Sequence, residues 1–138
     1  MRKPLNVLLA EDDVALRRCL AEVLAANGWS VHAADSGPAA VAVARQVPLD
    51  FSLLDMHLPG MTGIEVYRAI ALERGPLPWI LMSGQATPED AALARALGAH
   101  TFLRKPLDLT ALRNCLAELI CQHFGGTRPG LPRNPPPV

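Results

Sequence analysis

Short apolar runs alternate five times with amphipathic stretches along this chain, and that alternation limits its possible folds more than any other feature. The apolar runs, each of strand length, are Leu5–Ala10, Trp29–Ala34, Asp50–Leu54, Trp79–Ser83 and His100–Leu103. The first, third and fourth are almost continuously apolar, which is typical of parallel strands covered on both faces. Five strand–helix units predict an α/β fold with right-handed crossovers and a doubly wound, five-stranded parallel sheet.

The stretches between these runs carry helix patterns with recognisable ends. Apolar residues recur at helical spacing in Val14–Asn27, and Asn27–Gly28 suits the end of a helix. Thr62 and Glu65 have capping-box spacing, and Thr87 precedes a proline at the first helical position. The two remaining helices are expected from Ser36 to about Gln46 and from Asp108 to about Phe124.

Four of the five predicted strands end at charged or hydroxyl side chains. These are Glu11 and Asp12 after the first strand, Asp55 after the third, Ser83 in the fourth and Lys105 after the fifth. With the strand order 2-1-3-4-5, the carboxyl ends of strands 1, 3, 4 and 5 line one crevice, where ligands bind in open α/β sheets. The sequence therefore predicts one site made of these groups, with strand 2 outside it.

The predicted site has the chemistry of phosphoryl transfer. Carboxylates at one sheet edge repel one another unless a cation lies among them. Glu11, Asp12 and Asp55 are hard oxygen donors without neighbouring histidine or cysteine ligands, so Mg²⁺ is the natural candidate. Mg²⁺ keeps several waters, which phosphate oxygens can replace. The Lys105 charge and the Ser83 hydroxyl then complete a site that stabilises an added dianion.

The bulk properties of the chain narrow its class. Its 138 residues suit one domain, and 50% hydrophobic with 19% charged residues suit a compact, soluble protein. Lys+Arg and Asp+Glu number 13 each, which argues against binding to nucleic acid or a membrane surface. The three cysteines form no Cys-x-x-Cys pair, and no apolar run resembles a signal peptide or a membrane span. We therefore expect reduced thiols and a cytoplasmic protein.

The composition changes abruptly at Gly125, where a stretch rich in glycine and proline begins. We expect one domain over residues 1–124 and a flexible or polyproline tail, or the start of a linker, over residues 125–138. A docking peptide is the alternative, because Pro132-Arg133-Asn134-Pro135 matches the Pro-x-x-Pro pattern. That match is weak, since any proline-rich stretch contains it.

Four motifs between residue 5 and about residue 122 resemble those of the receiver domain of bacterial response regulators, the CheY-like domain of two-component signalling. They are Leu-Leu-Ala-Glu11-Asp12-Asp13, Leu-Leu-Asp55-Met-His-Leu-Pro-Gly-Met-Thr-Gly63, Ile-Leu-Met-Ser83-Gly84 and Leu-Arg-Lys105-Pro106. Each motif alone is weak, but the four in this order and spacing are specific. The resemblance implies a flavodoxin-like or CheY-like (βα)5 fold.

The resemblance also implies roles for the site residues. Asp55 would accept a phosphoryl group from the phosphohistidine of a sensor histidine kinase or phosphotransfer protein. Asp12 and Asp55 would bind Mg²⁺ directly, together with the His57 backbone carbonyl, and Glu11 would bind it through water. Lys105 would contact the phosphoryl group and respond to its arrival.

Further roles concern the switch and its reversal. Ser83 would bind a phosphoryl oxygen after a small shift of its loop, and Phe102, which stands where many members carry tyrosine, would change rotamer. The Lys105–Pro106 peptide bond is expected to be cis, as is usual in the family, although only about 5–6% of X–Pro bonds are cis. We also expect His57 and Gln85 to flank the attacking water and to modulate hydrolysis of the aspartyl phosphate.

The favoured interpretation is a single-domain receiver that binds a downstream protein through helix 4, strand 5 and helix 5. The first alternative is a receiver cut from a larger regulator that has a C-terminal output domain. A second is a phosphohydrolase, which is disfavoured because His57 occupies the position where such enzymes typically carry an acid. The reactions that we expect are therefore limited to phosphorylation and dephosphorylation of the domain itself. A third, a scaffold that is never phosphorylated, is disfavoured because the whole charged set is present. Asp13 is interpreted as a helix cap.

Overall fold

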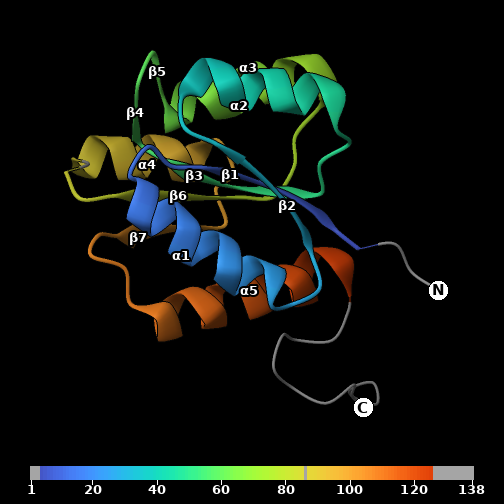
Figure 1. The fold of residues 1–138 in the computed structure, drawn as a ribbon. Coiled ribbons are helices and arrows are strands. Elements are labelled where there is room, and N and C mark those ends of the chain that lie inside the picture. Colours follow the sequence, from blue (N-terminus) through green and yellow to red (C-terminus); the bar gives the residue numbers. More distant parts are fainter. Residues whose placement is uncertain (1–3, 86, 126–138) are drawn as a thin grey trace.

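The computed structural model describes residues 4–85 and 87–125, which form a five-stranded parallel sheet (Figure 1). The sheet has the order β2-β1-β3-β6-β7, so the predicted order 2-1-3-4-5 is confirmed. Its strands are β1 (Asn6–Ala10), β2 (Ser30–Ala34), β3 (Phe51–Asp55), β6 (Trp79–Ser83) and β7 (Thr101–Arg104). The predicted tail lies outside the described residues, except for Gly125.

The three central strands are β1, β3 and β6, the ones whose sequences are almost continuously apolar. Every residue of β3 and β6 is buried, and in β1 only Asn6 is partly exposed. The edge strands β2 and β7 are more exposed, in keeping with their more polar sequences. The apolar runs therefore predicted which strands lie in the middle of the sheet, because only those strands need apolar side chains on both faces.

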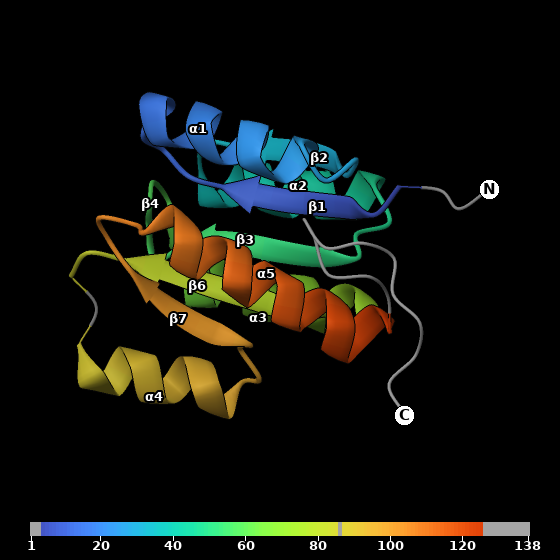
Figure 2. The same cartoon turned by 90° about the horizontal axis from the view of Figure 1, so that it is seen from below.

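Five helices cover the two faces of the sheet. α2 (Gly37–Gln46), α3 (Gly63–Arg74) and α4 (Pro88–Ala96) pack on one face, against side chains such as Leu8, Leu54 and Leu81. α1 (Val14–Ala25) and α5 (Leu109–Phe124) pack on the other face, against Leu9, Leu53 and Met82 (Figure 2). Consecutive residues of one strand therefore pack into the core on opposite faces of the sheet. Among the described residues, no helix has the length and hydropathy needed to span a membrane.

The predicted N-terminal helix caps are present and fix where each helix begins relative to its strand, whereas the first helix is capped at its C-terminal end at Ala26, one residue before the predicted Asn27–Gly28. Thr62 and Glu65 form a reciprocal capping box at the start of α3, and Thr87 forms another with Asp90 at the start of α4. The Asp13 carboxylate accepts a hydrogen bond from the Leu16 backbone N–H, at 2.9 Å, so Asp13 is indeed a cap. These caps place the loops that follow the strands, and those loops carry the charged residues.

A short hairpin after β3 was not predicted as strand structure. Its strands are β4 (His57–Leu58) and β5 (Met61–Thr62), joined by Pro59 and Gly60. Gly60 has a φ of +84°, as the third position of a type II turn requires, and proline suits the position before it. The hairpin leads the chain from Asp55 straight into α3.

Candidate functional site

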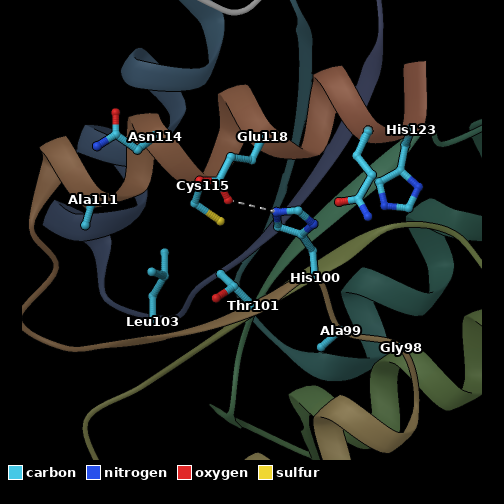
Figure 3. A pocket seen from close by; sticks show the side chains of 11 residues that line it. Gly98, Ala99, His100, Thr101, Leu103, Ala111, Asn114, Cys115, Glu118 and His123 are labelled. Carbon is cyan, nitrogen blue, oxygen red and sulfur yellow. Dashed lines mark ion pairs between the residues drawn. The ribbon is translucent and has the colours of Figure 1, made fainter. Parts of the chain in front are cut away.

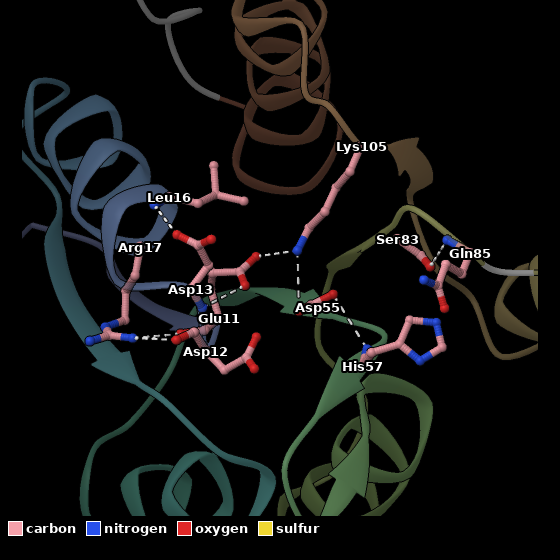
Figure 4. A network of polar contacts seen from close by, with 10 residues as sticks. All are labelled: Glu11, Asp12, Asp13, Leu16, Arg17, Asp55, His57, Ser83, Gln85 and Lys105. Atoms are coloured by element: carbon pink, nitrogen blue, oxygen red, sulfur yellow. Dashed lines mark hydrogen bonds and ion pairs between the residues drawn. The ribbon is translucent and has the colours of Figure 1, made fainter.

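The carboxyl ends of β1, β3, β6 and β7 bring the charged side chains together at one edge of the sheet (Figure 4). Glu11 directly follows β1, Asp55 ends β3, Ser83 ends β6, and Lys105 directly follows β7. β2 lies beyond β1 and contributes none of the predicted site residues. The sheet order alone thus brings together residues that are far apart in the sequence.

Lys105 lies between two buried carboxylates. Its Nζ is 2.6 Å from Glu11 Oε1 and 3.2 Å from Asp55 Oδ2, and its side chain is 22% exposed. Burial by itself lowers the pKa of Lys105, but the pairing with Glu11 and the charge of Asp55 outweigh it, so that this pKa is raised overall. The ammonium group therefore remains charged at neutral pH and offsets part of the local negative charge.

Glu11 is fully buried. Burial raises the pKa of its carboxyl, and the charge of Asp55 adds to this rise, whereas Lys105 and a hydrogen bond from the Asp13 backbone N–H oppose it. That hydrogen bond joins Asp13 N to Glu11 Oε2 at 3.1 Å. The net effect is a raised pKa, which means that the ionised carboxylate is held at an energetic cost and that an added cation would stabilise it.

Glu11, Asp12 and Asp55 form an acidic group in which each residue offers one carboxylate oxygen, all within 4.8 Å of one another. It is the only such group of potential metal ligands among residues 4–85 and 87–125. Asp12 is exposed, whereas the other two carboxylates are buried. Hard oxygen donors open to solvent on one side fit Mg²⁺, which binds one or two carboxylates and retains waters.

Asp55 is 3% exposed and uses both of its carboxylate oxygens. Oδ2 faces Lys105, and Oδ1 accepts a hydrogen bond from the His57 backbone N–H at 3.3 Å. The Ser83 hydroxyl is also buried, and its Oγ accepts a hydrogen bond from the Gln85 backbone N–H at 3.0 Å. Figure 4 shows Asp55 between the other acidic residues on one side and Ser83 with Gln85 on the other.

The helix α3 begins at Gly63, directly against the backbone of Asp55. A side chain at Gly63 would place its Cβ 2.4 Å from the Asp55 carbonyl oxygen and 2.9 Å from Leu81 Cδ1. The Gly63 N–H also donates to the Met56 carbonyl at 2.9 Å. Only glycine permits this approach, so Gly63 helps to hold the backbone that carries Asp55.

The remaining predicted residues lie beside this centre. Phe102 is half-buried and packs against the core on the α2–α3–α4 face, with the Arg104 guanidinium carbon 5.9 Å from its ring centroid. The Lys105–Pro106 bond is cis, the isomer that the resemblance implied. The His57 side chain is exposed.

Arg17 is a site residue that the sequence analysis missed. Its Nη1 donates hydrogen bonds to the backbone carbonyls of Glu11, at 2.9 Å, and of Asp12, at 3.3 Å. Its position on the first helix gave no sign of this contact, because side-chain patterns do not reveal which backbone carbonyls a guanidinium group can reach.

Comparison with known proteins identifies the family. Residues 7–117 match the model of the response regulator receiver domain, and the matched stretch contains every site residue described above. The chain belongs to the response regulator receiver family. The doubly wound sheet with its acidic group is thus the sheet of a receiver.

Curated relatives of the receiver include the cell cycle response regulator CtrA of Brucella ovis and of Brucella anthropi, each 32% identical over 102 residues. The match covers 74% of this chain but 44% of each relative. The chain therefore spans less than half the length of the curated relatives that it matches.

Solved structures share the fold. The non-phosphorylated receiver domain of HemR from Leptospira biflexa has a TM-score of 0.79 at 28% identity, covering 97% of this chain and all of that one. The chemotaxis protein CheY4 of Vibrio cholerae has a TM-score of 0.77 at 26% identity, covering 85% of this chain and 99% of that one. The predicted CheY-like fold is confirmed.

The receiver has a hollow between β7 and α5, at the end of β7 opposite to Lys105 (Figure 3). His100, Cys115, Glu118 and His123 line it, and His100 Nε2 lies 3.9 Å from Glu118 Oε2. Burial raises the pKa of the Cys115 thiol to about 12, so this thiol is unreactive at neutral pH. None of the residues of the acidic group lines this hollow.

Proposed function

We propose that Asp55 is the phosphoacceptor of this receiver and that a phosphohistidine on a sensor histidine kinase or phosphotransfer protein supplies the phosphoryl group. One observation carries the proposal: the buried Asp55 carboxylate lies 3.2 Å from the Lys105 ammonium and next to two further carboxylates. Folding alone gives no reason to bury the Glu11 and Asp55 carboxylates together at strand ends, whereas stabilising an added phosphoryl group does.

The transfer is a displacement at phosphorus. An Asp55 carboxylate oxygen forms the new P–O bond as the P–N bond to the donor histidine breaks, and the imidazole nitrogen keeps that electron pair. Lys105 already faces Asp55 Oδ2 and remains charged, so it can pair with a phosphoryl oxygen without reorganising. Ser83 provides a hydroxyl for a second phosphoryl oxygen once its loop shifts.

The acidic group would hold Mg²⁺ through the Asp12 and Asp55 carboxylates and the His57 backbone carbonyl, with Glu11 acting through water. When bound, Mg²⁺ supplies positive charge that neutralises the transferring phosphoryl group. The open side of the group at Asp12 leaves room for waters and phosphoryl oxygens.

The phosphorylated state would act on a protein partner through the surface of α4, β7 and α5. Phe102 in β7 is half-buried and would change its rotamer when Ser83 moves. A shift between two packed states of this surface would couple Asp55 to the affinity for a downstream effector protein. In this proposal the phosphorylated receiver binds proteins in the cytoplasm and does not itself bind nucleic acid or a membrane.

Hydrolysis of the aspartyl phosphate is the only further reaction in the proposal, and general phosphatase activity forms no part of it. We expect His57 and Gln85 to modulate this hydrolysis, because both residues are exposed and lie on the same side of Asp55 (Figure 4). Loss of radiolabelled phosphate from His57→Ala and Gln85→Ala, compared with the wild type, measures the effect. Unchanged rates in both variants would remove this role.

The receiver acts as a single domain in this proposal. The alternative is a receiver module of a larger regulator with a C-terminal output domain, which the greater length of the CtrA relatives favours. The intact mass of the protein isolated from its native cells decides between the two.

The main test is incubation with acetyl phosphate and Mg²⁺, read by intact-protein mass. The wild type is expected to gain the mass of one phosphoryl group, and Asp55→Asn to gain none. Asp35→Asn, which removes an exposed carboxylate outside the site, should behave as the wild type. A wild type that stays unmodified, or an Asp55→Asn variant that is modified equally, would contradict the proposal.

A further inference from the structure

Arg17 reaches back from α1 to the loop that joins β1 to this helix (Figure 4). Its two hydrogen bonds go to the carbonyl oxygens of Glu11 and Asp12, at 2.9 Å and 3.3 Å. These residues supply two of the three carboxylates in the acidic group. The arginine thus contacts the backbone that carries the carboxylates.

We propose that Arg17 is a positioning residue for the binding of a divalent cation, holding the Glu11–Asp12 backbone so that both carboxylates face the cation. The inference rests on the proposed function, because it takes Mg²⁺ as the ligand of the acidic group.

The loop needs such a restraint because two consecutive residues have opposite environments. The Glu11 side chain is fully buried and the Asp12 side chain is exposed, so the orientation of two adjacent peptide groups sets where both carboxylates point. Mutual repulsion would push these carboxylates apart if the backbone were free to relax. The guanidinium nitrogen Nη1 of Arg17, which donates to both carbonyls, opposes that relaxation.

The base of the Arg17 side chain is itself fixed. The Arg17 N–H donates to the Asp13 carbonyl at 2.8 Å, in the first turn of α1. Asp13 caps the helix through Leu16, and its own N–H holds the Glu11 carboxylate. The loop is therefore tied to the start of α1 at several points, and the cation site is pre-formed before the cation binds.

The charge of Arg17 taken alone predicts the opposite effect. A full positive charge beside the acidic group repels an incoming cation, so its removal should tighten Mg²⁺ binding if electrostatics dominated. Loss of positioning should weaken binding instead. The direction of the change therefore separates the two roles.

Isothermal titration calorimetry of the full chain with Mg²⁺, without any phosphodonor, measures whether the substitution weakens or tightens Mg²⁺ binding. Arg17→Met removes both the charge and the donors and is expected to weaken Mg²⁺ binding about tenfold. Arg18→Met is the matched control, because it removes the same charge from the next, exposed position of the helix. Its Mg²⁺ affinity should stay within about twofold of the wild type.

Arg17→Lys provides a second variant that keeps the charge but lacks the planar guanidinium group whose Nη1 reaches both carbonyls. It should weaken binding by an intermediate factor and serves in place of Arg17→Met if that variant does not fold, as shown by its melting curve without Mg²⁺. Wild-type affinity in the folded Arg17 variants, or tighter binding in Arg17→Met, would overturn the inference alone. A wild type that binds no Mg²⁺ would overturn the proposed function as well.

The dependence of phosphorylation on Mg²⁺ gives an independent readout. In the Arg17 variants, the Mg²⁺ concentration for half-maximal phosphorylation by acetyl phosphate should rise by the same factor as the dissociation constant. The rate at saturating Mg²⁺ should stay within about twofold of the wild type, since positioning is then restored by the bound ion. A large fall in that saturating rate would assign Arg17 to the transfer itself and overturn the positioning role.

Discussion

At the scale of single residues, the positive charge of Lys105 offsets the negative charge of the site. Its ammonium group compensates Glu11 and Asp55, both of them buried. Removing one partner of a buried ion pair leaves the other charge without compensation. Lys105→Met is therefore expected to lower the free energy of unfolding by about 1–3 kcal/mol at neutral pH, as measured by urea denaturation with the exposed Arg113→Met as control.

The difference in free energy of unfolding between the wild type and Lys105→Met should become smaller as the pH falls. Burial already raises the pKa of Glu11, and Lys105 opposes that rise, so the variant has a still higher Glu11 pKa. A carboxyl whose pKa is higher in the folded than in the unfolded protein gains stability as the pH falls through the folded-state value, because the folded protein binds the proton more tightly. An equal loss of free energy of unfolding in Lys105→Met at about pH 8 and about pH 5 would contradict this explanation.

Residues of the candidate site were predictable where their position followed from the sheet. Glu11, Asp55 and Lys105 stand at ends of apolar runs, and parallel strands bring those ends to one edge. Arg17 was not predictable, because its partners are carbonyl groups five and six residues earlier, and every residue carries such a group.

At the scale of elements, the packing of α5 against β7 has its own pH dependence through His100 (Figure 3). Burial lowers the pKa of His100, the neighbouring His123 lowers it further, and Glu118 opposes both. A histidine with a depressed folded-state pKa contributes stability above its unfolded value and loses that contribution as the pH falls through the folded value. The wild type should therefore lose stability below about pH 6.5.

His100→Gln should lose less stability than the wild type over this range, and His123→Gln should reduce the loss because one of its causes is removed. Urea midpoints of the three proteins at about pH 7.5 and about pH 5 measure the difference. Parallel losses in wild type and His100→Gln would show that another group is responsible.

Helices were better predicted than the hairpin between β3 and α3. The capping residues at Thr62 and Thr87 act on the backbone nearest to them, so their effect can be read from the local sequence. The strands β4 and β5 are two residues each, too short for any period of apolar residues to appear. The Pro59-Gly60 turn was the only available sign.

At the scale of the whole molecule, Mg²⁺ binding should stabilise the receiver because the acidic group draws on two different strand ends, β1 and β3. A ligand that binds only the folded state adds about 1.4 kcal/mol at ten times its dissociation constant. The melting temperature should therefore rise with Mg²⁺ in the wild type and in Asp35→Asn, and much less in Asp12→Asn. An equal rise in all three would place the cation elsewhere.

The most direct test of the account is to locate the phosphoryl group on the chain. Borohydride reduces an aspartyl phosphate to homoserine, so treating the phosphorylated receiver and mapping its peptides by mass identifies the residue. We expect homoserine at position 55 alone, and none in a reaction without Mg²⁺. Homoserine at Asp12 or Asp13, or an unmodified Asp55 in a protein that has gained a phosphoryl group, would contradict it.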